Sequence, residues 1–204
     1  MAEQKLKIAI TGSIGSGKTL FASFIEEIGF TVIDADKISK ELLGKDEKIK
    51  KEITKAFGAG SYVNGKPNLK YLAENVFSSM ENVQKINAIL HPVVIDRIEK
   101  KMDEELKKRR VVFVEAALIY EADMEDLFDY VVLVTADEDL RMARKKESKK
   151  ISEEEFIKRS NNQIPDSEKR KRADFTFDNN ATEAELKGKA NLLLMMLHTN
   201  AVKK

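Results

Sequence analysis

Residues 12–19, Gly-Ser-Ile-Gly-Ser-Gly-Lys-Thr, match the phosphate-binding pattern G-x-x-x-x-G-K-[ST]. The apolar run at residues 6–11 predicts a buried strand before this phosphate loop, and apolar residues at helical spacing predict a helix that begins inside it. The glycines let successive N–H groups point into one concavity at the positive end of that helix. Lys18 is expected to reach the β- and γ-phosphates of a nucleoside triphosphate, and the Thr19 hydroxyl to bind Mg²⁺. The predicted nucleotide contacts are Gly12, Ser13, Ile14, Gly15, Ser16, Gly17, Lys18, Thr19 and Leu20.

Two aspartates follow the second predicted strand, residues 30–33, in the sequence Asp34-Ala35-Asp36. Ligands of open parallel sheets lie beyond the carboxyl ends of the strands, so one of the two is placed to act as a base or to contact a metal. Alternatively, an aspartate here caps a helix that begins near Lys37. The two interpretations overlap, because a capping residue can also be catalytic. Asp36 is the better candidate for the base, and Asp34 for anchoring the turn or holding a magnesium-bound water.

Three further apolar runs complete a predicted five-stranded parallel sheet, since continuous apolar strands are typical of sheets covered on both faces. They are residues 111–114, 130–134 and 175–177. Glu115 ends the third strand at the same edge as the two aspartates. Either a water-mediated contact to Mg²⁺ or a capping or loop-anchoring role fits this position.

The segment between the second and third strands, residues 41–107, reads as a helical insertion. Gly44 is expected to separate two helical segments, and Ser78-x-x-Glu81 predicts the start of a long helix that runs to about residue 106. His91-Pro92 lies inside this helix, where proline removes a hydrogen bond and kinks the chain. The kink either bends the helix around a substrate, with His91 facing the ligand, or marks a joint packed against the core.

Residues 139–172 are predicted to form a lid. They contain 12 Lys and Arg residues against 7 Asp and Glu residues and few apolar ones, so we expect them to pack shallowly and to close over phosphates. Arg141 and Arg144 lie one turn apart on one helix face. Their guanidinium groups suit triphosphate oxygens, whereas most lysines of the segment belong to a solvated surface.

The composition indicates one domain with elaborations. The chain has 204 residues, 42% of them hydrophobic and 35% charged, with a formal net charge of +1 and no cysteine. The charge balance gives no reason to expect nucleic acid or an anionic membrane as a partner, and the missing cysteines exclude disulfides and thiolate nucleophiles. No signal peptide or membrane span is recognisable. We therefore expect a cytoplasmic enzyme, either a monomer or a small homo-oligomer.

Taken together, these stretches resemble the dephospho-CoA kinase family. The matching segments occur in the family's order and cover nearly the whole chain: Thr11–Thr19, Val32–Asp36, Phe57-Gly58, Leu90-His91-Pro92, Leu118–Glu121, Arg141-x-x-Arg144, Gln163, and Ala173-Asp174 continuing to Asn179. The resemblance implies an α/β fold of the P-loop nucleotide-kinase-like, three-layer type. It also implies transfer of the ATP γ-phosphoryl group to the ribose 3′-hydroxyl of dephospho-CoA, with magnesium. The implied parts are a core (1–40, 108–138 and 173–204), a helical acceptor-binding region (41–107) and a lid (139–172).

Matched position by position, the resemblance assigns roles to individual residues. Asp36 corresponds to the family's proposed base, and Lys18 and Thr19 to its phosphate and metal contacts. Arg144 corresponds to the lid arginine. The resemblance further places His91, Leu118 and both aspartates on the acceptor side, and Arg141 and Asn179 on the nucleotide side. The chain departs from the family pattern at four places: Ser13 replaces glycine, Glu115 replaces aspartate, Ala117 replaces proline, and Asn180-Ala181 replaces a glycine-containing turn.

Two alternatives remain open at the level of sequence. Another small-molecule kinase with the same loop, for a nucleoside monophosphate or shikimate, would keep the core and change the acceptor contacts. A nucleotide-dependent regulatory protein would be no kinase, but the sequence has neither D-x-x-G after the third strand nor the guanine-binding N-K-x-D.

Overall fold

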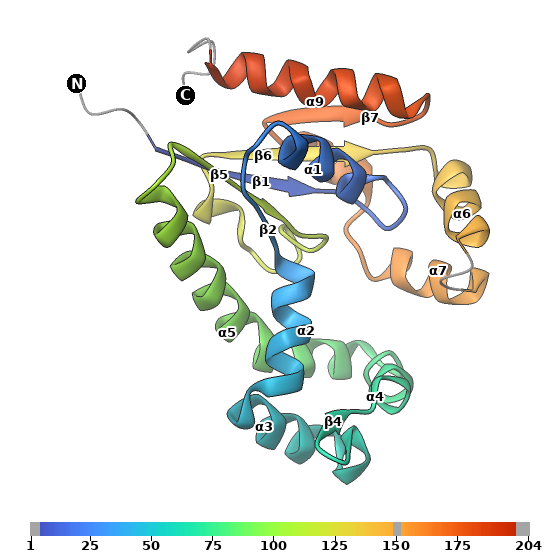
Figure 1. Ribbon diagram of the computed structural model, residues 1–204. Coiled ribbons are helices and arrows are strands. Elements are labelled where there is room, and N and C mark those ends of the chain that lie inside the picture. The colour runs from blue at the N-terminus through green and yellow to red at the C-terminus, as the bar shows by residue number, and fades with distance from the viewer. Residues whose placement is uncertain (1–4, 149–151, 199–204) are drawn as a thin grey trace. The chain divides into compact units, whose positions relative to one another are not determined.

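The computed structural model describes residues 5–148 and 152–198, so the ends of the predicted core segments and residues 149–151 of the predicted lid lie outside the described residues. The chain forms two compact units, one made of residues 1–33 and 104–204 and the other of residues 34–103. Figure 1 shows the sheet in the first unit and a set of helices in the second. The predicted division into core, acceptor-binding region and lid is a functional one and stays a prediction.

Five strands form the predicted parallel sheet, in the order β2-β5-β1-β6-β7. Their bounds are β1 Leu6–Thr11, β2 Val32–Asp34, β5 Val111–Glu115, β6 Tyr130–Thr135 and β7 Phe175–Asp178. β1 lies at the centre, with Ile10 opposite Glu115 of β5 on one side and opposite Val132 of β6 on the other. The fold class predicted from the sequence is therefore confirmed. The second strand, Val32–Asp34, begins and ends later than the predicted residues 30–33.

One face of this sheet is covered by α1 (Lys18–Glu27) and α9 (Glu183–His198), which lie beside each other in Figure 1. Their apolar side chains form a single buried cluster with alternate residues of the strands, such as Ile10 and Val132. The rings of Phe21 and Phe177 stack within it at 5.4 Å between centroids. This packing fixes the start of α1, and with it the phosphate loop, on the carboxyl end of β1.

The alternate strand residues face the other way, since side chains along a strand point to opposite faces. Leu133 and Thr135 of β6 point to this second face, where the turns after β5 and the short helix α8 (Asp166–Arg172) lie. The turns lead through η2 (Glu125–Leu127) into β6. Between β6 and α8 the chain forms α6 (Glu138–Glu147) and α7 (Glu153–Asn161). Arg141 of α6, Phe156 of α7 and Lys169 of α8 are buried, so the prediction that residues 139–172 pack only shallowly is wrong for these three side chains.

The second unit contains α2 (Ala35–Lys45), α3 (Glu47–Phe57), η1 (Ala59–Ser61), the hairpin β3 (Tyr62–Val63) and β4 (Lys66–Pro67), α4 (Leu69–Val76) and most of α5 (Met80–Leu106). Asn64 and Gly65 at the hairpin turn both have positive φ, as a tight two-residue turn requires. Two tyrosine hydroxyls join the elements, Tyr62 to the carbonyl of Leu43 and Tyr71 to that of Phe57.

Two local predictions for this unit were wrong. Gly44 lies inside α2, and the helices are separated at Asp46, whose carboxylate caps α3 through the N–H groups of Lys48 and Ile49. The long helix is capped by the hydroxyl of Ser79, one residue after the predicted Ser78. As predicted, it then runs as one helix, α5, through Pro92 to Leu106. Among the residues that the structure describes, no helix is long and apolar enough to cross a membrane.

Candidate functional site

The phosphate loop runs from the end of β1 to the first turn of α1 and is packed tightly from behind. Gly15 and Gly17 have φ values of 82° and 93°, which only glycine adopts without strain. A Cβ on Gly17 would lie 2.2 Å from Nδ2 of Asn179, and a Cβ on Gly12 would lie 2.1 Å from the carbonyl oxygen of Val134. The loop glycines are thus required by close neighbours as well as by backbone conformation.

Lys18, Thr19 and Glu115 meet in front of this loop. The Thr19 hydroxyl donates to Oε1 of Glu115 at 2.6 Å, and Nζ of Lys18 lies 3.3 Å from the same oxygen. Glu115 is only 8% exposed. An ammonium, a hydroxyl and a carboxylate therefore converge at the mouth of the loop, which brings together three residues that the sequence predicted for phosphate and metal binding.

Arg141 of α6 lies against the loop, although its contacts differ from the predicted one to phosphate. Its Nε donates to the carbonyl of Ala136 at 3.1 Å, its Nη1 donates to the carbonyl of Ile14 at 3.3 Å, and it lies 6.0 Å from the ring centroid of Phe156. It is 7% exposed. The buried guanidinium therefore supports the loop backbone in this structure.

Arg144, one turn further along α6, joins the same site through the end of β7. Its Nη2 donates to the carbonyl of Asn179 at 2.8 Å, while its buried Nη1 has no hydrogen-bond partner within the described part of the chain. The side chain of Asn179 in turn donates to the carbonyl of Ser16 at 2.8 Å. Asn179, predicted on the nucleotide side, thus links the loop to Arg144, whose second amino group is left for another acceptor.

Two side chains that residue spacing alone did not identify also hold the loop. Oε1 of Gln163 accepts from the N–H of Ile14 at 2.9 Å, and the Asp166 carboxylate accepts from the Ser13 hydroxyl at 2.5 Å. In the sequence, Gln163 is identified only through the family resemblance, and Asp166 is not singled out. No local pattern connects either residue with a loop about 150 positions away in the chain.

A buried ion pair fixes α8 behind these contacts. Nζ of Lys169, which is fully buried, lies 2.9 Å from Oε1 of Glu121, and the same oxygen accepts from the N–H of Ile164. Next to it, burial raises the pKa of Tyr120 from 10.0 to about 12, although Arg172 over its ring opposes the shift. This arrangement holds the chain that carries Gln163 and Asp166.

The two aspartates predicted to act on the acceptor belong to the second unit. Asp34 is the last residue of β2 and caps α2, because its carboxylate accepts from the N–H of Lys37 at 2.8 Å. Asp36 lies in the first turn of α2 and is exposed. The helix begins at Ala35 rather than near Lys37, so the cap is Asp34. The carboxylate of Asp36 accepts no side-chain cap bond there.

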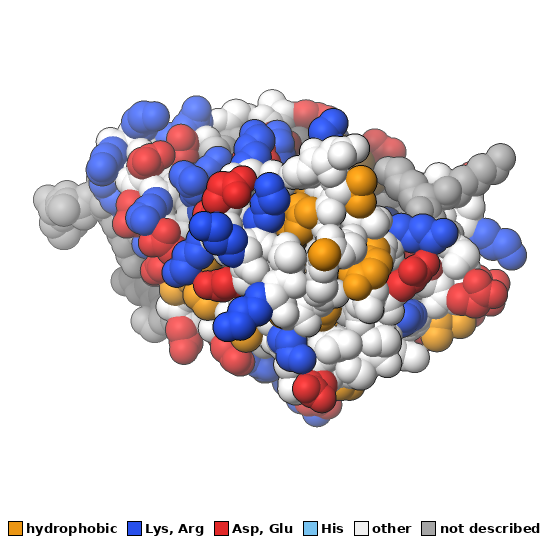
Figure 2. Space-filling view, turned by 90° about the horizontal axis from the view of Figure 1, so that it is seen from below, with side chains coloured by type: hydrophobic (Ala, Val, Ile, Leu, Met, Phe, Trp, Pro, Cys, Tyr) orange, Lys and Arg blue, Asp and Glu red, His pale blue; other side chains and the backbone are white. Residues whose placement is uncertain are grey.

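The other predicted acceptor contacts lie in both units. His91 is half-buried within α5, directly before Pro92. Leu118 lies in the turns after β5 and is 37% exposed. No group of three or more His, Cys, Asp or Glu side chains suited to a metal occurs among the described residues. Figure 2 shows Lys and Arg side chains mixed with Asp and Glu on the face it presents, as the small net charge leads one to expect.

Comparisons with known proteins point to one family. Residues 6–185 match the profile of the family described as dephospho-CoA kinase. The dephospho-CoA kinase of Staphylococcus aureus is 33% identical over 188 residues, which cover 92% of this chain and 91% of that protein. The dephospho-CoA kinase of Chlamydia abortus is 34% identical over 186 residues, with 90% and 92% covered.

Solved structures agree with the sequence comparison. A crystal structure from Thermus thermophilus has a TM-score of 0.78 at 30% identity and covers 95% of this chain and 98% of that one. Dephospho-CoA kinase from Campylobacter jejuni has a TM-score of 0.73 at 25% identity, with 98% and 100% covered. Shikimate kinase from Acinetobacter baumannii, at 16% identity and a TM-score of 0.56 with 98% and 97% covered, shares the fold.

Proposed function

The chain belongs to the dephospho-CoA kinase family, and from this premise we propose that it transfers the γ-phosphoryl group of ATP to the ribose 3′-hydroxyl of dephospho-CoA. The products are coenzyme A and ADP, as in the last step of coenzyme A synthesis. The observation that carries the proposal is the convergence of Lys18, Thr19 and Glu115 at the phosphate loop of a chain that matches this family over residues 6–185.

Lys18 and the loop amides bind the triphosphate in this proposal. Phosphoryl transfer demands little covalent work from a protein, so alignment and charge stabilisation supply most of the rate. Lys18 leaves Glu115 and reaches the β- and γ-phosphates. The positive end of α1 attracts the same oxygens.

The oxygen donors at the loop fit a magnesium ion. Mg²⁺ prefers hard oxygen ligands and is held in kinases by one or two protein groups together with substrate phosphates. The Thr19 hydroxyl and the Glu115 carboxylate, 2.6 Å apart, are such groups. Thr19 would bind the ion directly, and Glu115 and Asp34 through water. When bound, the ion neutralises charge on the phosphates.

Asp36 is the proposed base. It would orient the ribose hydroxyl and accept its proton as the new bond to phosphorus forms. Its exposure and its position in the first turn of α2 support this role, because the carboxylate makes no capping bond that would have to break. His91 and Leu118 are the proposed acceptor contacts, and Asp34 fixes the start of the helix that carries the base.

Two arginines from the predicted lid complete the proposed site. Arg144 neutralises charge that develops on the transferred group, with its unpartnered Nη1 as the free donor. Arg141 holds the loop that contacts the nucleotide. Closure of residues 139–172 would exclude water, which would otherwise hydrolyse ATP.

The identity of the preferred phosphoryl acceptor distinguishes this proposal from its alternatives. A coupled ATP assay with dephospho-CoA, AMP, UMP and shikimate tests it, with Lys18→Ala as the control that abolishes turnover. Dephospho-CoA should give the highest kcat/KM. Equal or better turnover of AMP, UMP or shikimate would reject the assignment, and hydrolysis independent of any acceptor would favour a regulatory protein. A cytoplasmic location and the oligomeric state stay predictions.

A further inference from the structure

Side chains from the predicted lid segment form hydrogen bonds with the tip of the phosphate loop. Ile14 has both its backbone groups engaged, the N–H by Gln163 and the carbonyl by Arg141. The neighbouring Ser13 donates its hydroxyl to Asp166. The contact to Ser13 places the negatively charged Asp166 next to a loop proposed to bind the negatively charged triphosphate.

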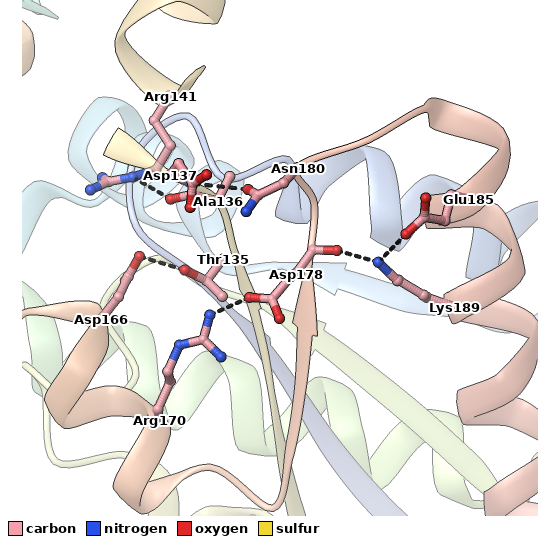
Figure 3. A network of polar contacts seen from close by, with 10 residues as sticks. All are labelled: Thr135, Ala136, Asp137, Arg141, Asp166, Arg170, Asp178, Asn180, Glu185 and Lys189. Atoms are coloured by element: carbon pink, nitrogen blue, oxygen red, sulfur yellow. Dashed lines mark hydrogen bonds and ion pairs between the residues drawn. The ribbon is translucent and has the colours of Figure 1, made fainter. Parts of the chain in front are cut away.

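Asp166 bridges two elements of the core. Its Oδ1 accepts from the Ser13 hydroxyl at 2.5 Å and its Oδ2 accepts from the Thr135 hydroxyl at 2.7 Å. Figure 3 shows Asp166 reaching from the start of α8 to Thr135 at the end of β6. Ser13 and Thr135 are 5% and 3% exposed. Each carboxylate oxygen thus has one hydroxyl donor, and the loop is tied to the strand through them.

The helix that carries Asp166 is itself fixed. Arg170, one turn further along α8, pairs with Asp178 at the end of β7, as Figure 3 shows. Lys169 on the buried side pairs with Glu121. These two contacts join α8 to the end of β7 and to the turns after β5, so the core holds the helix that carries Asp166.

The hydroxyl of Ser13 makes the bridge possible. Glycine, the usual family residue at this position, has no side chain to donate to Asp166. A loop fixed in advance loses less conformational entropy when a ligand binds.

We propose that Asp166 is a positioning residue for the phosphate loop, and that the Ser13–Asp166–Thr135 bridge raises the affinity for ATP by holding the loop ready for the triphosphate. This inference rests on the proposed function only in that the loop binds ATP. Two effects of Asp166 oppose each other, since its negative charge repels phosphate while its hydrogen bonds fix the loop. Both oxygens are engaged by hydroxyl donors, so positioning outweighs repulsion.

The test measures ATP dissociation constants by calorimetry, together with melting temperatures. Asp166→Ala removes the bridge, Ser13→Ala removes it from the loop side, and Thr135→Val removes it from the strand side without touching the loop. Asp166→Asn keeps an acceptor for one hydroxyl and a donor to the other. Glu168→Gln on the same helix is the control, because it removes one negative charge from an exposed carboxylate that pairs with Lys171.

The ATP dissociation constant should rise about tenfold in Asp166→Ala and Ser13→Ala, the effect of losing one charge-assisted hydrogen bond. The double variant Ser13→Ala/Asp166→Ala should bind ATP no more weakly than the weaker-binding of the two single variants, since both substitutions break the same bridge. Thr135→Val should also raise the ATP dissociation constant. Asp166→Asn should recover most of the affinity, and Glu168→Gln should bind as the parent does. At saturating ATP, the kcat of Thr135→Val and of Asp166→Ala should change less than twofold.

Three results would overturn the inference: tighter ATP binding in Asp166→Ala, additive losses in the double variant, or a lowered melting temperature with unchanged ATP affinity. If Asp166→Ala does not fold, Ser13→Ala and Thr135→Val still measure the bridge. Direct ATP binding needs no acceptor, so a protein that binds ATP as expected but rejects dephospho-CoA would refute the proposed function and leave this inference standing.

Discussion

The carboxylate of Glu115 accepts a hydrogen bond from the hydroxyl of Thr19 at 2.6 Å, and the same oxygen lies 3.3 Å from the ammonium of Lys18. The register of the two strands brings this about, because Glu115 at the end of β5 pairs with Ile10 near the end of β1, directly before the phosphate loop. In the structure this carboxylate contacts both the side chain proposed to bind the triphosphate and the one proposed to bind its metal. The proposed function therefore requires ATP to displace Glu115 from Lys18.

Glu115→Gln should raise the Mg²⁺ concentration for half-maximal turnover by about 10–100-fold, the usual cost of removing a carboxylate that holds a metal through water. The amide still accepts from Thr19, so the fold should persist. A magnesium titration of turnover measures the effect, with Glu27→Gln, a surface carboxylate paired with Lys187, as the control. An unchanged magnesium dependence would show that Glu115 only anchors the loop.

Asp36→Asn should lower turnover by about 10²–10⁴-fold, because the amide cannot accept a proton. ATP affinity and the melting temperature should hardly change, since Asp36 is exposed. Asp34 should behave differently. Asp34→Asn keeps the helix cap, whereas Asp34→Ala removes the bond to the N–H of Lys37 and should cost about 0.5–2 kcal/mol of stability.

Turnover of all three variants across a magnesium titration, together with urea unfolding, distinguishes the role of Asp34 from that of Asp36. Asp34→Asn should be impaired mainly at low magnesium. An active Asp36→Asn together with an inactive Asp34→Asn would reverse the assignment of the base.

Arg144→Ala should lower turnover, and Arg144→Lys should restore little of it. Nη2 of the guanidinium donates to the carbonyl of Asn179, and Nη1 has no partner among the described residues. A lysine ammonium cannot reproduce this planar pair of donors. Turnover and melting temperature of both variants provide the check. If lysine restores full turnover, charge alone is required; if both variants mainly lose melting temperature, Arg144 is structural.

Lys169→Met should destabilise the protein by about 3–5 kcal/mol, because it leaves the Glu121 carboxylate in a buried site without its counter-ion. Adding Glu121→Gln should recover much of the loss. The matched control is Lys171→Met in the same helix, whose exposed pair with Glu168 should contribute at most about 1 kcal/mol. Denaturant unfolding measures all three. Equal losses at the two lysines would show that burial of the pair is unimportant.

Tyr120→Phe should make stability less sensitive to alkaline pH. Burial raises the pKa of Tyr120 to about 12 from 10.0, so above about pH 10 the folded chain binds the phenolic proton more tightly than the unfolded chain. The stability from this proton is complete below pH 10 and is lost as the pH rises through about 12. Urea unfolding at about pH 9 and pH 11 should show a smaller decrease for the variant than for the parent. Equal decreases would contradict this expectation.

Local patterns in the sequence were sufficient for the sheet and the phosphate loop. Each strand is a short, mainly apolar segment. Gly15, Gly17, Lys18 and Thr19 lie within eight residues, so their spacing alone specifies the loop. Where local signals were ambiguous, prediction failed by a few residues. Asp46 separates α2 from α3 in place of Gly44, and Ser79 caps α5 in place of Ser78, since neighbouring polar residues compete for the same capping position.

The sequence by itself determined the fold class, the position of the phosphate loop, and the residues that resemble a kinase family. Only the tertiary structure decided which side chains support that loop. Glu115 lies 96 residues from Thr19, Gln163 lies 149 residues from Ile14, and Asp166 lies 153 residues from Ser13. Strand order, register and the packing of α8 bring these pairs together. Such contacts depend on the arrangement of the whole sheet, so the hydrophobic periodicity of a single segment cannot predict them.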